Sequence, residues 1–485
     1  MLENINTIFI LESIDFSSRN IAAENALQKA NLLGEVHKTI LLVTDYCPNL
    51  YSIYGEMINS GKLVEGTNIM SVYDFFQKMY HSTIKPVSRT PNPIPGEDYR
   101  EVAANVFEVR THEGHVRTEY YNHANFGLRL VENFVNGKRT EDFYYNEHGY
   151  LSKINVHDEL PYDEYYTIEG ALCLKAEYDA TNKICKLTLF DDDGYVIREF
   201  KDNMEMTAFL LEGMLTANDE NQDFFVQAEG SGNVKALAPL ERKNIINACA
   251  LQDDSLQELQ ADLLNAFIFQ TEEARGEFVR QNGGKVNTFV IPLPYNGQVE
   301  QVTFESRTPQ KAVILTDFEP EENIRSAIDI FRPVVEQVPG AILEIYGQGP
   351  DESNCRRHIQ SLELEDNVFI KSIPNDPALV FSGAVMAMCA TGGSIRTFLE
   401  SIKNGCPCFA FGTTYVARDV ITDGHNGYLI PEGDKALFTK KIVKYLEDES
   451  FQRQMSENAY QSAKRFDAQS FLDKWKAMME GLFRQ

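Results

Sequence analysis

Gly392, Gly393 and Ser394 stand between an apolar run, AVMAMCA, and a helix-forming run that contains Arg396 and Glu400. Backbone N–H groups at the start of a helix have no partner within the helix, so they can bind an anion such as a phosphate. A Gly-Gly-Ser helix entry is nevertheless usually only a turn with a cap. Both uses of this junction, an anion site and an ordinary helix start, stay open.

Other kinds of site have weaker support in the sequence. His112 and His115 lie close together on an expected hairpin, but no third metal ligand is near them. The eight cysteines are scattered along the chain, which is typical of reduced, mostly buried thiols. No serine-nucleophile, Walker or dinucleotide-binding motif occurs. We therefore expect no metal and no cofactor.

Alternating strand and helix patterns must position the glycine-rich junction. Apolar runs at 7–11 and 39–44 flank a helix-like segment at 20–33, which predicts a right-handed parallel crossover. The alternation resumes at 223 and a second complete series begins at 311. We predict an α/β fold with two doubly wound, Rossmann-like domains whose strand ends face a ligand cleft.

Residues 100–202 have a different texture, with aromatic-rich alternating segments separated by turn residues. The segments 145–150 and 190–195 look like two copies of one turn unit that ends in Gly and an aromatic residue. We predict an antiparallel β-module inserted into the first domain. Tyrosines on its edge hairpins are candidate contacts for a partner or an acceptor, although a plain hydrophobic core would also explain many of them: Tyr120, Tyr121, Tyr144 and Tyr145.

These patterns predict five segments along the chain. They are 1–90 and 204–300 for the first Rossmann-like domain, 91–203 for the β-module, 301–465 for the second Rossmann-like domain, and 466–485 for a C-terminal crossover helix.

The charge of the chain limits its partners. It has 45 basic and 72 acidic residues and a formal net charge of −27, which repels nucleic acids and anionic membranes. The first residues lack a basic region and a cleavage site, and no run is long and apolar enough to span a membrane. We expect a cytoplasmic protein that contacts membranes at most peripherally and does not bind nucleic acid.

The second α/β half resembles the retaining family-4 glycosyltransferases in the order of its parts. The similar segments are AVILTDFEPEENIRSAIDIF, AILEIYGQGP with its glycines Gly347 and Gly349, NVFIKSIPND, and the segment from CATGGSIRTF to DGHNGYLIPEGD. The β-module resembles that of the subgroup which glycosylates wall teichoic acid or serine-rich adhesins. The resemblance implies a GT-B fold and a site for a nucleotide-sugar donor on the second domain.

The sequence departs from this family where a departing diphosphate needs positive charge. The family places an Arg three residues before its Pro and a Lys two residues after it, whereas Asp317 and Glu322 hold these places around Pro320. At about 4 to 5 Å and an effective dielectric near 20, each unit charge is worth about 3 to 4 kcal/mol. Two reversals should therefore oppose diphosphate binding strongly.

The glycine-rich junction departs from the family in the same way. The family carries two Glu eight positions apart, the first contacting the transferred sugar and the second the ribose. Glu400 matches the second, but Gly392 holds the place of the first. Glu400 alone is ambiguous, because an exposed helix glutamate explains it equally well.

The first domain lacks two further family features. Its first strand-to-helix loop has Arg19 and Asn20 where the family has glycines that admit the diphosphate. The family's inter-domain His also has no counterpart, since no His occurs between His157 and His358.

We therefore predict a catalytically inactive relative, with Asp317, Glu322 and Gly392 as degenerate positions. It looks like the non-catalytic subunit of the accessory-Sec O-GlcNAc transferase pair, which implies two partners: a catalytic glycosyltransferase subunit and an unfolded Ser/Thr-rich acceptor protein. The alternative is an active retaining enzyme that uses UDP-GlcNAc or UDP-glucose, with Arg19, Arg325 or Arg396 at the diphosphate. Its donor would contact Arg19, Asn20, Gly347, Gly349, Gly392, Gly393, Ser394 and Glu400.

Overall fold

The computed structural model describes most of the chain. The described residues are 5–14, 21–34, 38–79, 87, 91, 94–112, 114–122, 127–216, 222–237, 240, 244–251, 264–282, 286–295, 302–316, 318, 320–374, 376, 378–389 and 395–484. Described residues up to 267 form one compact unit, and those of 268–481 form a second. The predicted domain boundaries stay a prediction.

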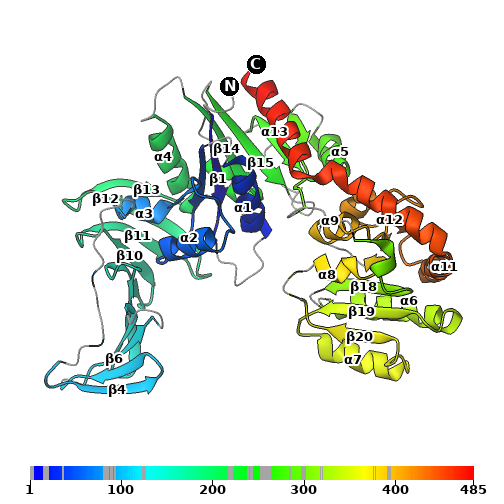
Figure 1. Ribbon diagram of the computed structural model, residues 1–485. Helices are drawn as coiled ribbons and strands as arrows, with labels where there is room; N and C mark the ends of the chain where they lie inside the picture. The colour runs from blue at the N-terminus through cyan, green and yellow to red at the C-terminus, as the bar shows by residue number, and fades with distance from the viewer. Residues whose placement is uncertain are drawn as a thin grey trace. The chain divides into compact units, whose positions relative to one another are not determined.

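A seven-stranded sheet carries the first α/β series (Figure 1). Its strand order is β17-β16-β15-β14-β1-β2-β3, with β1 (Ile5–Leu11), β2 (Lys38–Val43), β3 (Asn68–Ser71), β14 (Asp223–Glu229), β15 (Ile245–Leu251), β16 (Ala266–Phe269) and β17 (Asn287–Val290). The helices of this series are α1 (Ile21–Leu33), α2 (Leu50–Asn59), α3 (Val72–Phe76), α4 (Asn203–Thr216) and α5 (Glu272–Asn282).

The burial of β1 fits its place as an inner strand of this sheet. All seven of its residues are buried, and it pairs in parallel with β14 on one side and β2 on the other. Strands that are covered on both faces are typical of parallel sheets flanked by helices. The parallel strand–helix–strand arrangement predicted from residues 7–44 is therefore confirmed, while its right-handedness stays a prediction.

Strand β3 runs directly into the short helix α3. The side chain of Ser71 caps its start by accepting from the N–H groups of Tyr73 and Asp74. Its end follows from the backbone of Lys78, which has a φ of 58° and cannot continue a right-handed helix. Helix α2 and strand β3 lie between the predicted elements and were not expected from the pattern.

The inserted module is one ten-stranded antiparallel meander in which each strand pairs with its sequence neighbours. Its strands are β4 (Asp98–Ala103), β5 (Val106–Arg110), β6 (Val116–Tyr121), β7 (Leu128–Val135), β8 (Lys138–Tyr145), β9 (Leu151–Val156), β10 (Tyr162–Tyr166), β11 (Leu172–Tyr178), β12 (Ile184–Phe190) and β13 (Val196–Phe200). The fold class, with an antiparallel β-rich insertion in an α/β chain, is confirmed.

The two predicted turn units belong to a larger set in the module. In five of its described turns the N–H of the first residue donates to the C=O of the fifth, at 111–115, 146–150, 167–171, 179–183 and 191–195. In all five the side chain of the first residue also accepts from the N–H of the fifth. Gly149 and Gly194 have a φ of 82°, as a hairpin turn with a bulge requires.

The second unit holds a six-stranded sheet of order β20-β19-β18-β21-β22-β23. Its strands are β18 (Lys311–Thr316), β19 (Ile342–Gly347), β20 (Val368–Lys371), β21 (Met386–Cys389), β22 (Cys408–Phe411) and β23 (Gly427–Ile430). Its helices are α6 (Glu321–Gln337), α7 (Glu352–Ser361), α8 (Ala378–Ser382), α9 (Ile395–Lys403), α10 (Tyr415–Val420), α11 (Lys435–Leu446), α12 (Glu449–Ala463) and α13 (Ala468–Phe483).

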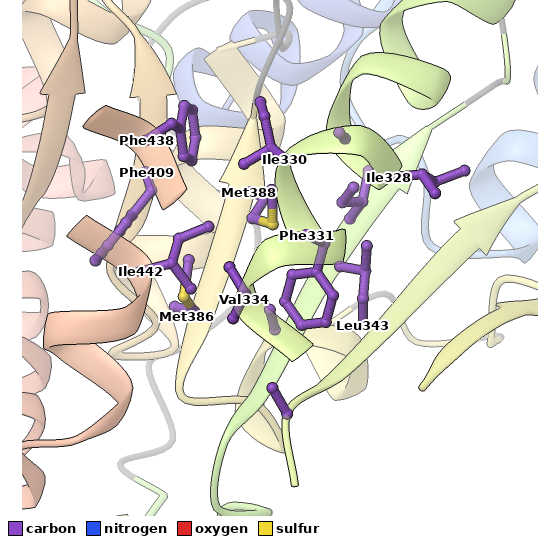
Figure 2. Packing of buried hydrophobic residues seen from close by; sticks show 14 of the residues in the cluster. Ile328, Ile330, Phe331, Val334, Leu343, Met386, Met388, Phe409, Phe438 and Ile442 are labelled. Carbon is purple, nitrogen blue, oxygen red and sulfur yellow. The ribbon is translucent and has the colours of Figure 1, made fainter. Parts of the chain in front are cut away.

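One hydrophobic core fixes α6 on this sheet. Figure 2 shows Phe331 and Val334 of α6 close to Met386 and Met388 of β21, with Ile442 of α11 on the other side. All five side chains are at most 1% exposed. This packing places the start of α6 at the carboxyl end of β18.

In the described part of the chain, no helix combines the length and the apolar character that crossing a bilayer requires.

Candidate functional site

The carboxyl end of β19 lies against the loop that follows β18. Gly347 is opposite Thr316 in the parallel register. A Cβ added at Gly347 would lie 2.1 Å from the Thr316 carbonyl oxygen and 2.9 Å from Cε2 of Phe318. Phe318 is fully buried and has a φ of 62°. Gly347 is therefore required by close packing, and the Phe318 ring fills the space beside it.

Gly349, the second glycine of this turn, is half-buried. Its carbonyl oxygen accepts from the N–H of Glu352 at 3.4 Å. This glycine therefore has a local role at the start of α7.

Negative side chains occupy the start of α6. Pro320 is the N-cap residue and makes no side-chain cap bond, while Glu321 and Glu322 lie in the first turn. Glu321 accepts from Asn354 at 2.8 Å, and Glu322 is exposed. Carboxylates in this position stabilise the helix dipole and repel a phosphate. Glu322 thus places an anion where the resemblance called for a cation.

Arg325 lies one turn further along α6. Its guanidinium is 3.3 Å from a carboxylate oxygen of Glu321, and its side chain is 50% exposed. No described contact joins Arg325 to Glu400. The geometry is that of a surface helix charge paired within its own helix.

Glu400 lies on α9, and its environment corrects one expectation. Its side chain is only 13% exposed, and its Oε2 is 3.2 Å from Nζ of Lys403, which is 8% exposed. The interpretation as an exposed helix glutamate is therefore wrong. Phe398 and Leu399 of the same helix pack into the core, and this places the neighbouring Glu400 close to the core as well.

The ring of Tyr295 also lies near Lys403, the cationic partner of Glu400. Nζ of Lys403 lies 5.5 Å from the centre of the Tyr295 ring. Burial, followed by the charges of Asp467 and Glu400, raises the pKa of Tyr295. Glu400 and Lys403 form a nearly neutral pair, so a ribose hydroxyl at Glu400 would share the carboxylate with this lysine.

Several predicted site residues lie outside the described residues, namely Arg19, Asn20, Asp317, Gly392, Gly393 and Ser394. Arg396 is described and is exposed in the first turn of α9.

The candidate contact tyrosines are not on edge hairpins. Tyr120 and Tyr121 lie on β6, and Tyr144 and Tyr145 lie on β8, both inner strands of a sheet whose edge strands are β4 and β13. The expectation of edge positions is wrong because all ten strands join one meander. Tyr121 is 7% exposed.

Three of these tyrosines make contacts within the module. Tyr120 donates to Glu132 at 2.8 Å and Tyr121 donates to Glu119 at 2.7 Å. Burial, followed by the bond to Glu132, raises the pKa of Tyr120. Nζ of Lys153 lies 4.5 Å from the centre of the Tyr144 ring. Tyr120, Tyr144 and Tyr145 are half-buried, and contact with a partner through them stays a prediction.

Within the described ranges, no group of three or more His, Cys, Asp or Glu side chains could hold a metal ion. His112 and His115 are exposed on the turn 111–115. Six cysteines are buried, and burial raises the pKa of Cys406 to about 12, which makes this thiol a poor nucleophile.

Sequence reasoning missed two acidic residues of the first unit whose pKa is raised. Burial, followed by the charge of Glu12, raises the pKa of Asp45 to about 6. Burial, followed by the charge of Glu147, raises the pKa of Asp74 to about 7. Only tertiary contacts reveal this, since Asp74 reads as an ordinary first-turn residue after the cap Ser71.

Comparison with known families decides what the second unit is. Residues 299–462 match the family described as "Glycosyl transferases group 1". The chain carries a glycosyltransferase group 1 domain with the GT-B fold. The six-stranded sheet of the second unit lies within the matched residues, as do the candidate positions Glu322, Gly347 and Glu400.

Two relatives match less than half of the chain. The chain is 28% identical over 215 residues to the poly(glycerol-phosphate) α-glucosyltransferase of Bacillus subtilis (strain 168), covering 44% of this chain and 32% of that protein. It is 27% identical over 225 residues to the GtfA subunit of the UDP-N-acetylglucosamine–peptide N-acetylglucosaminyltransferase of Streptococcus gordonii, covering 43% and 44%. The matches thus span less than half of these two proteins.

A third relative matches along nearly its whole length. The chain is 21% identical over 475 residues to the poly(ribitol-phosphate) α-N-acetylglucosaminyltransferase of Staphylococcus aureus (strain COL), covering 90% and 91%.

Solved structures share the fold of this chain over nearly its whole length. The crystal structure of TarM gives a TM-score of 0.80 at 16% identity and covers 99% of each chain. That of a GtfA/B complex gives 0.79 at 17% identity and covers 99% of this chain and 100% of the other. At these identities the likeness establishes the fold alone.

Proposed function

We propose that this chain is a non-catalytic subunit of a glycosyltransferase complex, which holds an unfolded Ser/Thr-rich protein for O-glycosylation. The observation that carries the proposal is the start of α6, where Glu321 and Glu322 stand at the carboxyl end of β18. A site that releases a nucleoside diphosphate requires preorganised positive charge at this place.

Packing around the glycine turn supports the proposal. Phe318 fills the space next to Gly347, and Arg325 is paired with Glu321. A diphosphate approaching this turn would meet a buried ring on one side and two carboxylates on the other.

Known relatives support the assignment of a partner. One relative is named as the GtfA subunit of a peptide N-acetylglucosaminyltransferase, and the fold matches a GtfA/B complex. We propose that the partner of this chain is likewise a catalytic glycosyltransferase subunit, which acts on the acceptor that this chain holds.

The second candidate is an active retaining transferase that uses UDP-GlcNAc or UDP-glucose on a surface protein or teichoic-acid acceptor. The retained Glu400, largely shielded on α9, favours it, because a carboxylate at this place suits a ribose. The glucosyltransferase and N-acetylglucosaminyltransferase names of two relatives also favour it.

Calorimetry with UDP and with UDP-N-acetylglucosamine tests the proposal. We expect dissociation constants of about 1 mM or weaker, which is about 4 kcal/mol of binding free energy or less. Micromolar binding that is lost in Glu400→Ala would instead establish a working donor site.

Restoring the cations sharpens this test. The double variant Asp317→Arg/Glu322→Lys should bind UDP at least about tenfold more tightly than the native chain, because attraction replaces repulsion at the phosphates. Glu336→Lys is the matched control for Glu322→Lys alone, since both change the charge by the same amount and Glu336 lies at the far end of α6. An equal gain in the control would show that only net charge matters.

Association with a partner is tested by co-expression with a catalytic glycosyltransferase encoded beside this chain. The two should co-purify and then modify a Ser/Thr-rich acceptor, and deletion of residues 100–202 should prevent co-purification. Circular dichroism of the deletion variant shows whether its α/β part is still folded. Sugar transfer by the purified chain alone would contradict a non-catalytic role.

A further inference from the structure

A turn of the β-module caps a helix of the α/β part of the first unit. The Glu147 carboxylate accepts from the N–H groups of Tyr51 at 2.8 Å and Ser52 at 2.5 Å, and also from the Ser52 hydroxyl. The N–H of Glu147 donates to the carbonyl of Pro48 at 3.1 Å. The N-cap residue Asn49 makes no side-chain cap bond. The start of α2 therefore depends on a residue 95 to 96 positions away in the sequence.

Neighbouring contacts hold the module at the same place. The Gln77 side-chain amide donates to the carbonyls of Ser152 at 2.6 Å and Tyr166 at 3.0 Å. The rings of Tyr73 and Tyr165 lie 4.7 Å apart between their centres. We call the contact between segment 46–79 and the module the joint.

Asp74 lies in this joint and is only 5% exposed. Among the described residues its carboxyl group has no hydrogen bond, although its own N–H donates to Ser71. Glu147 is the charged group that acts most strongly on it, and burial and this charge together raise its pKa to about 7. Asp74 is therefore a buried acid in the same joint as the Glu147 carboxylate.

Other titratable groups surround Asp74 in the joint. They are Asp45 and Tyr46 before α2, Tyr51 on α2, Tyr73 and Lys78 around α3, Glu147 and His148 in the module turn, Lys153 on β9, and Asp163 and Tyr165 on β10. The lysines have other partners: Lys153 lies 3.1 Å from Asp163, and Lys78 lies 2.6 Å from Asp192. Within the described part of the chain, burial and the charge of Glu147 act on Asp74, and no cationic group offsets them.

We propose that Asp74 and Glu147 form a proton-controlled latch between the β-module and α2, closed when Asp74 is protonated and weakened when it ionises. The sign follows from linkage: a carboxyl group whose pKa is raised in the docked state favours docking at low pH. This contribution is lost as the pH rises from about 4, the ordinary range of an aspartate, to about 7. The inference needs no catalytic activity and stands apart from the proposed function.

Hydrogen exchange on the full chain tests the latch. Protection of the peptides that cover 50–56 and 146–153, corrected for intrinsic exchange rates, should fall about tenfold between pH 6 and pH 8, because Asp74 ionises over this range. In Asp74→Asn the same protection should be independent of pH. Equal pH dependence in Asp74→Asn and in the native chain would overturn the proposal, as would pH-independent protection in the native chain.

Two further variants separate Asp74 from its neighbours. His148→Gln removes a side chain of the kind that titrates near neutral pH, and the pH dependence should persist in it. Its disappearance there would assign the effect to His148 and reject the latch. Glu147→Gln removes the opposing charge but not the burial of Asp74, so it should reduce the pH dependence without abolishing it, while lowering protection at every pH. This variant decides the question even if Asp74→Asn fails to fold.

Discussion

The helices α2 and α6 both follow parallel strands, β2 and β18. The negative charge at the two helix starts comes from different parts of the chain. At α2 the carboxylate comes from Glu147 in the distant β-module. At α6 the carboxylates are Glu321 and Glu322 of the helix itself. In both cases the chain supplies the negative charge that a bound ligand could have supplied.

The difference shows what each helix start can contribute. The cap of α2 belongs to a network with Gln77 and buried tyrosines, so losing it should loosen one part of the unit from another. The carboxylates of α6 are local, and Glu322 is exposed, so losing one should change charge more than structure. The second helix start is held in place instead by the buried residues beside it, above all Phe318.

The largest effect should follow from emptying the space beside α6. Phe318→Ala should lower the free energy of unfolding by about 3 to 5 kcal/mol, because it removes a fully buried ring and leaves a cavity. Urea denaturation measures this, with Ile373→Ala as control, since Ile373 is 39% exposed. A loss below about 1 kcal/mol in Phe318→Ala would show that the ring is not part of the core.

A smaller effect should follow from removing the cap of α2. Glu147→Ala should cost about 2 kcal/mol, because two backbone N–H groups lose a charged acceptor. Glu169→Ala is the control, as Glu169 is exposed on the related turn 167–171. Thermal unfolding of the two variants should therefore differ, and equal midpoints would mean that α2 does not depend on the module.

The smallest effect should come from the first turn of α6. Glu322→Gln should lower the free energy of unfolding by about 0.5 kcal/mol through weaker compensation of the helix dipole. Glu336→Gln, near the other end of the same helix, should have no cost or a slight gain by the same argument. Differential scanning calorimetry distinguishes these signs. A gain in Glu322→Gln would indicate that repulsion with Glu321 outweighs the dipole.

Much of the fold could be predicted because its signals are local. The buried strand β1, the helix α6 and the alternating strands of the module are each visible in the period of their apolar residues. The end of α3 just before Lys78 could not be predicted, since a positive φ at a lysine has no sequence signature. The short helix α10 could not be predicted, because it is too short to show a helical period of apolar residues.

The candidate site was predicted less completely, for a physical reason. The charge at Glu322 and the pairing distance of Glu400 and Lys403 can be read from the sequence, because they depend on helix spacing. The burial of Glu400 and the position of the Phe318 ring depend on packing between elements. The acids of the joint depend on contacts between residues as many as 96 positions apart.

The repeated turns of the module offer positions where a single substitution can change what the module contacts. Each turn is closed by backbone bonds between its first and fifth residues, so the second residue is not needed to hold the hairpin. In two turns that second residue already reaches the α/β part, where Glu147 binds α2 and Asp192 binds Lys78. Substituting the second residue of another turn should therefore change what that turn binds without changing the register of its strands.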